Sequence, residues 1–190
     1  MTDKTTPAAK PSRRTLAGVL GTIVGALALF TMVPAEESGR TVQATARADG
    51  SVAIRHVAGR QYLAVYLDMV GVPTACDGLT RGMRLGQTFT EAQCAAKLEV
   101  ELIDTASHVV DCVPGLYGRD HQAPAAVSLA YNIGWPGFCR STAARRFNAG
   151  QWRSGCDAFA MWNKAGGRVV PGLVDRRKRE RALCLKGLPR

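Results

Sequence analysis

The longest uncharged stretch of the chain lies close to its beginning. Residues 15–35, TLAGVLGTIVGALALFTMVPA, contain no charged residue, and about 20 apolar residues are enough for a helix that crosses a bilayer. Basic residues precede this run, so residues 1–14 are expected to form a cytoplasmic head and the rest of the chain to be exported. Two interpretations stay open. The long polar head favours an uncleaved signal anchor, and Val33-Pro34-Ala35 is the site for a cleaved signal peptide.

After this run, the pattern predicts a linker and then a folded domain. Residues 36–50 are small and polar and predict a linker, so the domain is expected over 51–190. Apolar residues recur over 51–64 and predict a first helix that is interrupted at Gly59. Residues 66–87 are rich in glycine and hold short β-branched runs, which predicts a hairpin.

The remainder of the domain predicts helices. Thr90 and Gln93 have the spacing of a capping box, in which each side chain satisfies a backbone donor of the other residue. The helix that starts there is expected to run to about Val110. Further helices are expected over 120–132, 141–150 and 173–185. The pattern therefore predicts an α+β domain that is mostly helical, with one small β element near its start.

Composition narrows the class of protein. The chain has 190 residues and a net charge of +10, which favours one globular domain with short appendages. With 46% hydrophobic and 21% charged residues, a wholly disordered chain is excluded. One apolar run alone is long enough to span a bilayer, which excludes a multi-span membrane protein. The basic charge would suit nucleic acid, but export argues against a nucleic-acid partner.

All six cysteines lie beyond the exported run: Cys76, Cys94, Cys112, Cys139, Cys156 and Cys184. An even number in an exported domain predicts up to three disulfides. Six cysteines allow fifteen pairings, so the connectivity stays open. The sequence has no Cys-x-x-Cys pair, and its three histidines are not spaced with cysteine as zinc ligands. We therefore expect no metal and no other cofactor.

Four blocks of residues occur in an order that carries a family resemblance. They are Tyr66, Asp68, Gly71, Thr74, Cys76, Gly78 and Thr80; Leu85, Gly86, Thr90 and Cys94; Ser128 to Gly134 with Phe138, Ser141 and Thr142; and Trp162, Ala165 to Gly167, Gly172, Leu173, Arg176, Arg177 and Glu180. Over about 56–187 the chain resembles the phage-type lysozymes and endolysins of glycoside hydrolase family 24, including those with a signal-anchor-release N-terminus. The resemblance implies a lysozyme-like fold, with a cleft between a small β-hairpin lobe and a helical lobe.

The resemblance also implies an activity and its residues. Family members cut the β-1,4 bond between N-acetylmuramic acid and N-acetylglucosamine in peptidoglycan. We therefore expect a monomer that lyses a host wall. It would be secreted to the periplasmic or extracellular side, or held at the inner membrane by residues 15–35. The family's catalytic Asp and Thr match Asp68 and Thr74. Tyr131 and Asn132 are expected to hold substrate. Trp135 and Trp162 are candidates for stacking on sugar rings, with packing in the core as an equal alternative.

The family's catalytic glutamate has no counterpart at its expected position. In the family it ends the first helix, nine residues before the Asp, and that position here is Gly59. Glycoside cleavage normally needs two carboxyl groups, and glycine cannot donate a proton. His56, one helical turn earlier, and Asp77, in the hairpin, are the candidate substitutes. Glu36 or Glu37 would need a shifted register, and both flank the apolar run. Two functions therefore stay open: a muramidase with a non-standard acid, and a weak or inactive pseudoenzyme that binds peptidoglycan.

Overall fold

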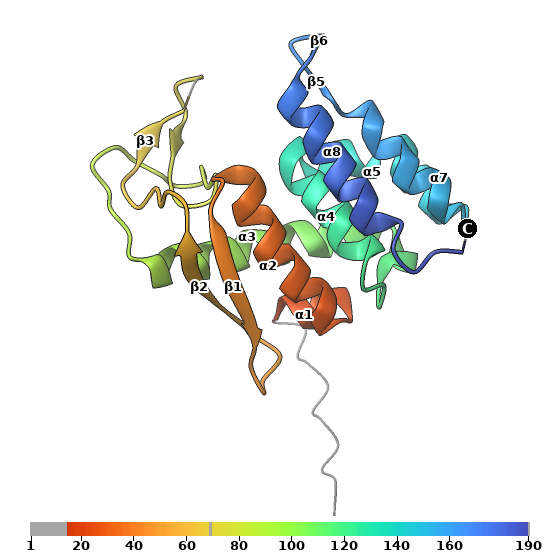
Figure 1. Ribbon diagram of the computed structural model, residues 1–190, viewed down its shortest axis with the longest axis horizontal. Helices are drawn as coiled ribbons and strands as arrows, with labels where there is room; N and C mark the ends of the chain where they lie inside the picture. Colours follow the sequence, from red (N-terminus) through yellow and green to blue (C-terminus); the bar gives the residue numbers. More distant parts are fainter. Residues whose placement is uncertain (1–14, 69, 190) are drawn as a thin grey trace, which may run out of the picture.

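The computed structural model describes residues 15–68 and 70–189, and it consists of a small lobe beside a larger helical lobe (Figure 1). The expected cytoplasmic head, residues 1–14, lies outside the described residues. The helices are α1 (Leu16–Leu20), α2 (Ile23–Glu37), α3 (Glu91–Cys112), α4 (Gln122–Ile133), α5 (Trp135–Cys139), α6 (Thr142–Asn148), α7 (Trp152–Asp157) and α8 (Pro171–Cys184). Short 3-10 helices cover Pro114–Leu116 and Ala158–Met161.

Within the described residues, the strands form three separate antiparallel pairs. They are β1 (Thr41–Ala46) with β2 (Val52–Ala58), β3 (Tyr66–Leu67) with β4 (Pro73–Thr74), and β5 (Lys164–Ala165) with β6 (Arg168–Val169). The expected α+β class with a mostly helical content is confirmed, and the hairpin expected within 66–87 is the β3–β4 pair.

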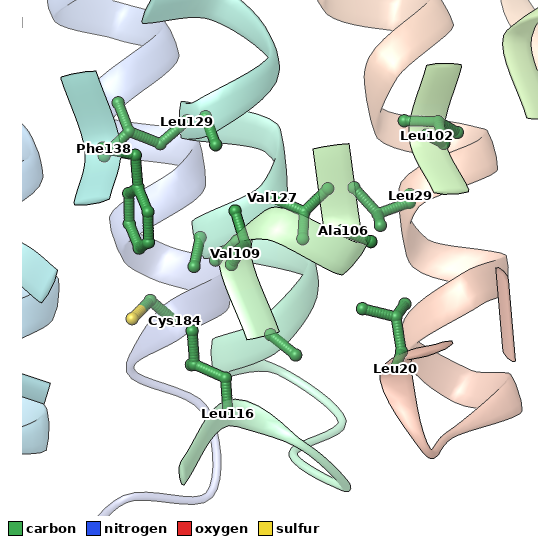
Figure 2. Packing of buried hydrophobic residues seen from close by; sticks show 14 of the residues in the cluster. Leu20, Leu29, Leu102, Ala106, Val109, Leu116, Val127, Leu129, Phe138 and Cys184 are labelled. Carbon is green, nitrogen blue, oxygen red and sulfur yellow. The ribbon is translucent and has the colours of Figure 1, made fainter. Parts of the chain in front are cut away.

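The apolar run folds as two helices where the pattern predicts one of membrane length. The break falls at Gly21, whose φ of +73° lies in the left-handed region that favours glycine. Thr22 then caps α2 by accepting a hydrogen bond from the amide of Gly25 at 3.4 Å. Leu20 and Leu29 are fully buried and point toward α3 and α4 (Figure 2). Within residues 15–68 and 70–189, no helix combines the length and the apolar content that crossing a bilayer requires.

The prediction of a helix over 51–64 is wrong. The segment expected to be a linker, residues 36–50, contains strand β1. Residues 41–46 and 52–58 pair as the β1–β2 hairpin. Side chains alternate along a strand, and Val52 and Ile54 face the large hydrophobic cluster while Arg55 and Val57 are exposed. The apolar spacing that suggested a helix therefore belongs to a two-residue period.

Each lobe has its own hydrophobic core, and α3 contributes to both. The small core consists of Val65, Ala75, Cys76, Leu79, Met83 and Cys94. From α3, the large core takes Leu98, Leu102, Ala106 and Val109. The predicted capping box starts this helix, with Thr90 accepting from the Gln93 amide at 3.2 Å and Gln93 accepting from the Thr90 amide at 2.8 Å. The helix ends at Cys112, two residues beyond the expected end.

All six cysteines form disulfides, which confirms the expected number. The pairs are Cys76–Cys94, Cys112–Cys139 and Cys156–Cys184. The first joins the β3–β4 segment to α3 inside the small lobe, and the other two lie in the helical lobe. Each lobe therefore contains at least one disulfide cross-link.

Candidate functional site

Glu37 is the last residue of α2, and its carboxylate contacts both lobes. Its Oε1 accepts a hydrogen bond from Arg176 of α8 at 2.7 Å. Its Oε2 lies 3.1 Å from the point that a Cβ on Gly78 would occupy, so a side chain at that position would crowd the carboxylate. The Glu37 side chain is 18% exposed. A carboxyl group at the junction of the lobes is thus held in place and open to solvent.

Arg176 belongs to a buried charge network in the helical lobe. The carboxylate of Glu180 is fully buried and accepts from Arg176 at 3.1 Å, from Arg177 at 3.3 Å and from the Ser128 hydroxyl at 2.8 Å. Burial raises the pKa of Glu180, and the charges of the two arginines oppose that rise. Arg176 therefore divides its guanidinium between Glu180 and Glu37, which fixes the donor that orients Glu37.

Thr74 lies on β4, and Asp68 directly follows β3. One carboxylate oxygen of Asp68 accepts from the backbone amides of Val70 at 2.9 Å and Val72 at 2.8 Å. Thr74 is buried, pairs with Tyr66 across the strands, and donates its hydroxyl to the Val72 carbonyl at 3.0 Å. These bonds fix both side chains on one short hairpin.

Tyr66 links this hairpin electrostatically to Glu37. The pKa of the Tyr66 phenol is raised mainly by burial, and further by the phenol of Tyr62 and by the negative charges of Asp68 and Glu37. Both carboxylates therefore act on the same ring. Glycoside hydrolysis uses a pair of carboxyl groups.

Asp77, one of the candidate substitutes, is closed off by its partners. Its two carboxylate oxygens accept from Arg40 at 2.7 Å each, and Oδ1 also accepts from the Ser38 hydroxyl at 2.8 Å. The side chain has no exposed surface. Protein donors occupy this carboxylate, so Asp77 is placed as a structural clamp and not toward a substrate.

The other two positions singled out for the acid, Gly59 and His56, are not where the helix expectation puts them. Gly59 follows strand β2 with a φ of +91°, and a Cβ there would lie 2.8 Å from the Cα of Arg40. His56 lies within β2, and its backbone amide donates to Glu91 at 2.6 Å. The helix face that would have joined His56 to Gly59 does not exist.

A cavity of about 210 Å³ opens beside Gly78 and follows α3. It is lined by Gly78, Leu79, Thr80, Arg81, Glu101, Thr105 and Tyr131. The Tyr131 hydroxyl donates to the Asp77 carbonyl at 3.1 Å. Burial strongly raises the pKa of this phenol, and nearby Glu37 adds to the rise. Tyr131 therefore remains a neutral hydrogen-bonding wall of the cavity.

The other two expected substrate-binding residues lie away from this wall. Asn132 is exposed, and its side-chain oxygen accepts from Arg177 at 2.9 Å. The Trp162 ring packs against the large core and near Gly137. Of the three residues, only Tyr131 lines the cavity. Sequence reasoning did not anticipate Arg176 as the partner of Glu37, because the two lie 139 positions apart.

Comparisons with known proteins agree with this architecture. The phage lysozyme family model matches residues 59–180. The SAR-endolysin of Enterobacteria phage P21 is 38% identical over 128 residues, which cover 64% of this chain and 74% of that protein. The SAR-endolysin of Pseudomonas phage phiKMV is 38% identical over 125 residues, which cover 64% of this chain and 77% of that protein.

Solved structures show the same fold. A mutant of P22 lysozyme has a TM-score of 0.56 and 32% identity, covering 66% of this chain and 88% of that one. The active form of the P1 phage endolysin Lyz has a TM-score of 0.67 at 21% identity, covering 92% of this chain and 95% of that one. At this low identity, the similarity to the P1 endolysin concerns the fold alone. Because it covers 92% of this chain, it includes the N-terminal helices α1 and α2. With a family model that matches more than half of its length, this chain belongs to the phage lysozyme family and has the lysozyme-like fold of phage endolysins.

Proposed function

We propose that the chain is an exported endolysin that hydrolyses the β-1,4 bond between N-acetylmuramic acid and N-acetylglucosamine, with Glu37 as the general acid. One observation carries the proposal: Glu37 ends the helix that precedes the strands, reaches the junction of the lobes and is held there by Arg176. This is the place in the chain where the family resemblance requires a glutamate. Counting nine residues back from Asp68 reaches Gly59 and not Glu37, because the β1–β2 hairpin lies between Glu37 and Asp68.

The chemistry assigns a different task to each side chain. Glu37, protonated, donates to the oxygen of the departing sugar, while Asp68 stabilises the sugar cation or orients the attacking water. Thr74, on the same hairpin as Asp68, assists in holding that water. Arg176 orients Glu37 through one nitrogen and bonds Glu180 through another.

The apolar run is part of the proposal as the export segment. Relatives named SAR-endolysins motivate this assignment. The run is uncharged, and its buried leucines suit either a bilayer or the protein core, since both environments exclude water. We propose that residues 15–35 bring the chain to the outer side of the inner membrane, where a monomer acts on peptidoglycan.

The test is wall clearing by Glu37→Gln. This variant keeps the shape of the side chain and removes its proton, so we expect clearing to fall by about 10²–10⁴-fold. Glu36→Gln is the matched control, because Glu36 is the preceding residue and binds Arg179 instead of Arg176. The control should clear walls at the wild-type rate, with both proteins shown to be folded by circular dichroism.

Two results would contradict this assignment. Full activity in Glu37→Gln together with loss in His56→Gln would transfer the role to the histidine. A folded wild type that binds peptidoglycan but releases no fragments, even after long incubation, would make the chain a pseudoenzyme. Asp68→Asn separates the two functions further. A binding protein should keep its affinity for peptidoglycan in this variant, and a muramidase should lose its activity.

A further inference from the structure

A row of polar side chains on α3 leads from the cavity to a tryptophan that lies outside it. Arg81, in the cavity wall, lies 3.4 Å from both Glu101 and Asp104. Asp104 in turn lies 3.9 Å from the ring of His108. That ring stacks on Trp135 with the ring centres 3.9 Å apart and the planes 17° apart. Side-chain contacts thus run from the cavity wall to Trp135.

Helix geometry places Trp135 about one turn beyond the cavity. Thr105 and Tyr131 line the cavity. His108 follows Thr105 by three residues of α3, a rise of about 4.5 Å along the helix axis. Trp135 follows Tyr131 by four residues, at the start of α5. The indole and the cavity therefore lie along the same face of α3.

Trp135 differs from the other two tryptophans in its packing. Trp152 and Trp162 pack against the large hydrophobic core. Trp135 is 38% exposed, and among residues 15–68 and 70–189 it belongs to neither core cluster. His108 covers one face of the indole and holds it in place. A rigid, accessible aromatic ring beside carboxylates is typical of a site that takes an amphipathic ligand.

We propose that Trp135, supported by His108, is a distal subsite that binds one further N-acetylated sugar ring of the glycan strand. The proposal rests on the muramidase function proposed above, and it extends the cavity along α3. A sugar ring has a face of C–H groups, which suits the indole, and hydroxyl and amide groups at its edge. Asp104, 40% exposed, offers a carboxylate to those donors, and Arg81 offers a guanidinium to the acetyl oxygen.

The test is the dependence of binding and cleavage on the length of the glycan. Soluble peptidoglycan oligosaccharides of two, four, six and eight rings are titrated by calorimetry and, separately, digested. In the wild type, affinity should rise when the strand becomes long enough to reach Trp135. In Trp135→Ala this step should disappear. For long strands, affinity should fall and KM should rise, each by about two- to tenfold. Short strands should be unaffected, and Trp135→Phe should keep most of the step.

Met161→Ala is the control, because Met161 is an exposed apolar residue outside the site. It should reproduce the length dependence of the wild type. An equal loss at every length in Trp135→Ala would make Trp135 a structural residue and overturn the subsite, as would no loss at any length. Loss of binding to intact walls with unchanged affinity for eight-ring strands would assign Trp135 to another wall component. If the wild type cleaves nothing, the muramidase proposal fails, and calorimetry still decides the subsite.

Discussion

Two acid–arginine pairs lie beside the same loop, and they differ in what surrounds them. Asp77 accepts from Arg40 through both oxygens and is completely buried. Glu37 accepts from a single nitrogen of Arg176 and remains partly exposed. Gly78 follows Asp77 in the chain and touches Glu37. The comparison teaches that solvent access and the number of donors, and not the pairing itself, separate the structural carboxylate from the one that we propose to be reactive.

The closed pair holds the open one in position. Ser38, which directly follows Glu37, donates to Asp77, and Arg40 is two residues further along. Tyr131 donates to the carbonyl of Asp77 from the helical lobe. The Asp77 clamp therefore ties the end of α2, the loop at Gly78 and the cavity wall together. Glu37 sits on that support.

The largest effect on stability should come from breaking the closed pair. Asp77→Asn leaves the buried Arg40 guanidinium with only the more distant Glu91 carboxylate, 3.9 Å away, and the loss of a buried partner costs about 3–5 kcal/mol of unfolding free energy. The measurement is urea unfolding at neutral pH with the disulfides intact. Asp175→Asn is the control, because Asp175 pairs with Lys178 at the surface, where solvent screens the pair, and its loss should be far smaller. Equal, small losses in the two variants would show that the clamp is not structural.

The sequence predicts the helical lobe far better than the segment before Asp68. The capping box at Thr90 and the helix up to about Val110 follow from local rules that need no tertiary information. The six cysteines predict three bridges, but their pairing depends on which segments meet in space. The fold class and the positions of Asp68 and Thr74 on a hairpin also follow from the pattern and the family resemblance.

The position that we propose for the acid could not be predicted by counting. Val52, Ile54 and Val57 fit either a helix or a strand, and the strand is decided by pairing with residues 41–46. Once these residues form a hairpin, the family spacing no longer applies between Glu37 and Asp68. The apolar run is ambiguous for a similar reason, because the same uncharged residues suit a membrane and a core. Only tertiary structure brings Glu37 to Arg176.

A smaller effect on stability is expected for Gly59→Glu, a variant that tests whether residue 59 or Glu37 is the position of the acid. Gly59→Glu puts a side chain on a residue at φ +91°, with its Cβ 2.8 Å from the Cα of Arg40. Strain of this kind costs about 1–3 kcal/mol, and it falls on the arginine that holds Asp77. We therefore expect lower stability and no gain in wall clearing.

The control for Gly59→Glu is Gly82→Ala. Gly82 has a similar positive φ, and a Cβ there would meet no atom within 4 Å, so this variant isolates the backbone cost. The difference between the two unfolding free energies then measures the crowding at Arg40. A Gly59→Glu variant that clears walls faster than the wild type would return the acid position to residue 59 and remove the distinction between the two pairs.

The smallest effect concerns Glu36, whose side chain is only 6% exposed and pairs with Arg179, which is more than half exposed. Burial alone would raise the pKa of Glu36, but the hydrogen bond and charge of Arg179, with help from Arg176 and Arg177, lower it below its ordinary value of 4.5. A carboxyl whose pKa is lower in the folded state stabilises the fold above its unfolded pKa. This contribution is lost as the pH falls through the folded-state pKa.

Glu36→Gln should therefore cost about 0.5–1 kcal/mol at pH 7, since Arg179 is more than half exposed. The difference from the wild type should shrink as the pH falls below about 4.5, when the wild-type carboxyl takes up its proton. Urea midpoints from pH 7 down to pH 3 measure this trend. A loss that stays constant over the whole range would mean that the charge of Glu36 contributes nothing. The Glu36–Arg179 pair, in which one partner is more than half exposed, would then differ from the Asp77–Arg40 pair, in which both side chains are buried.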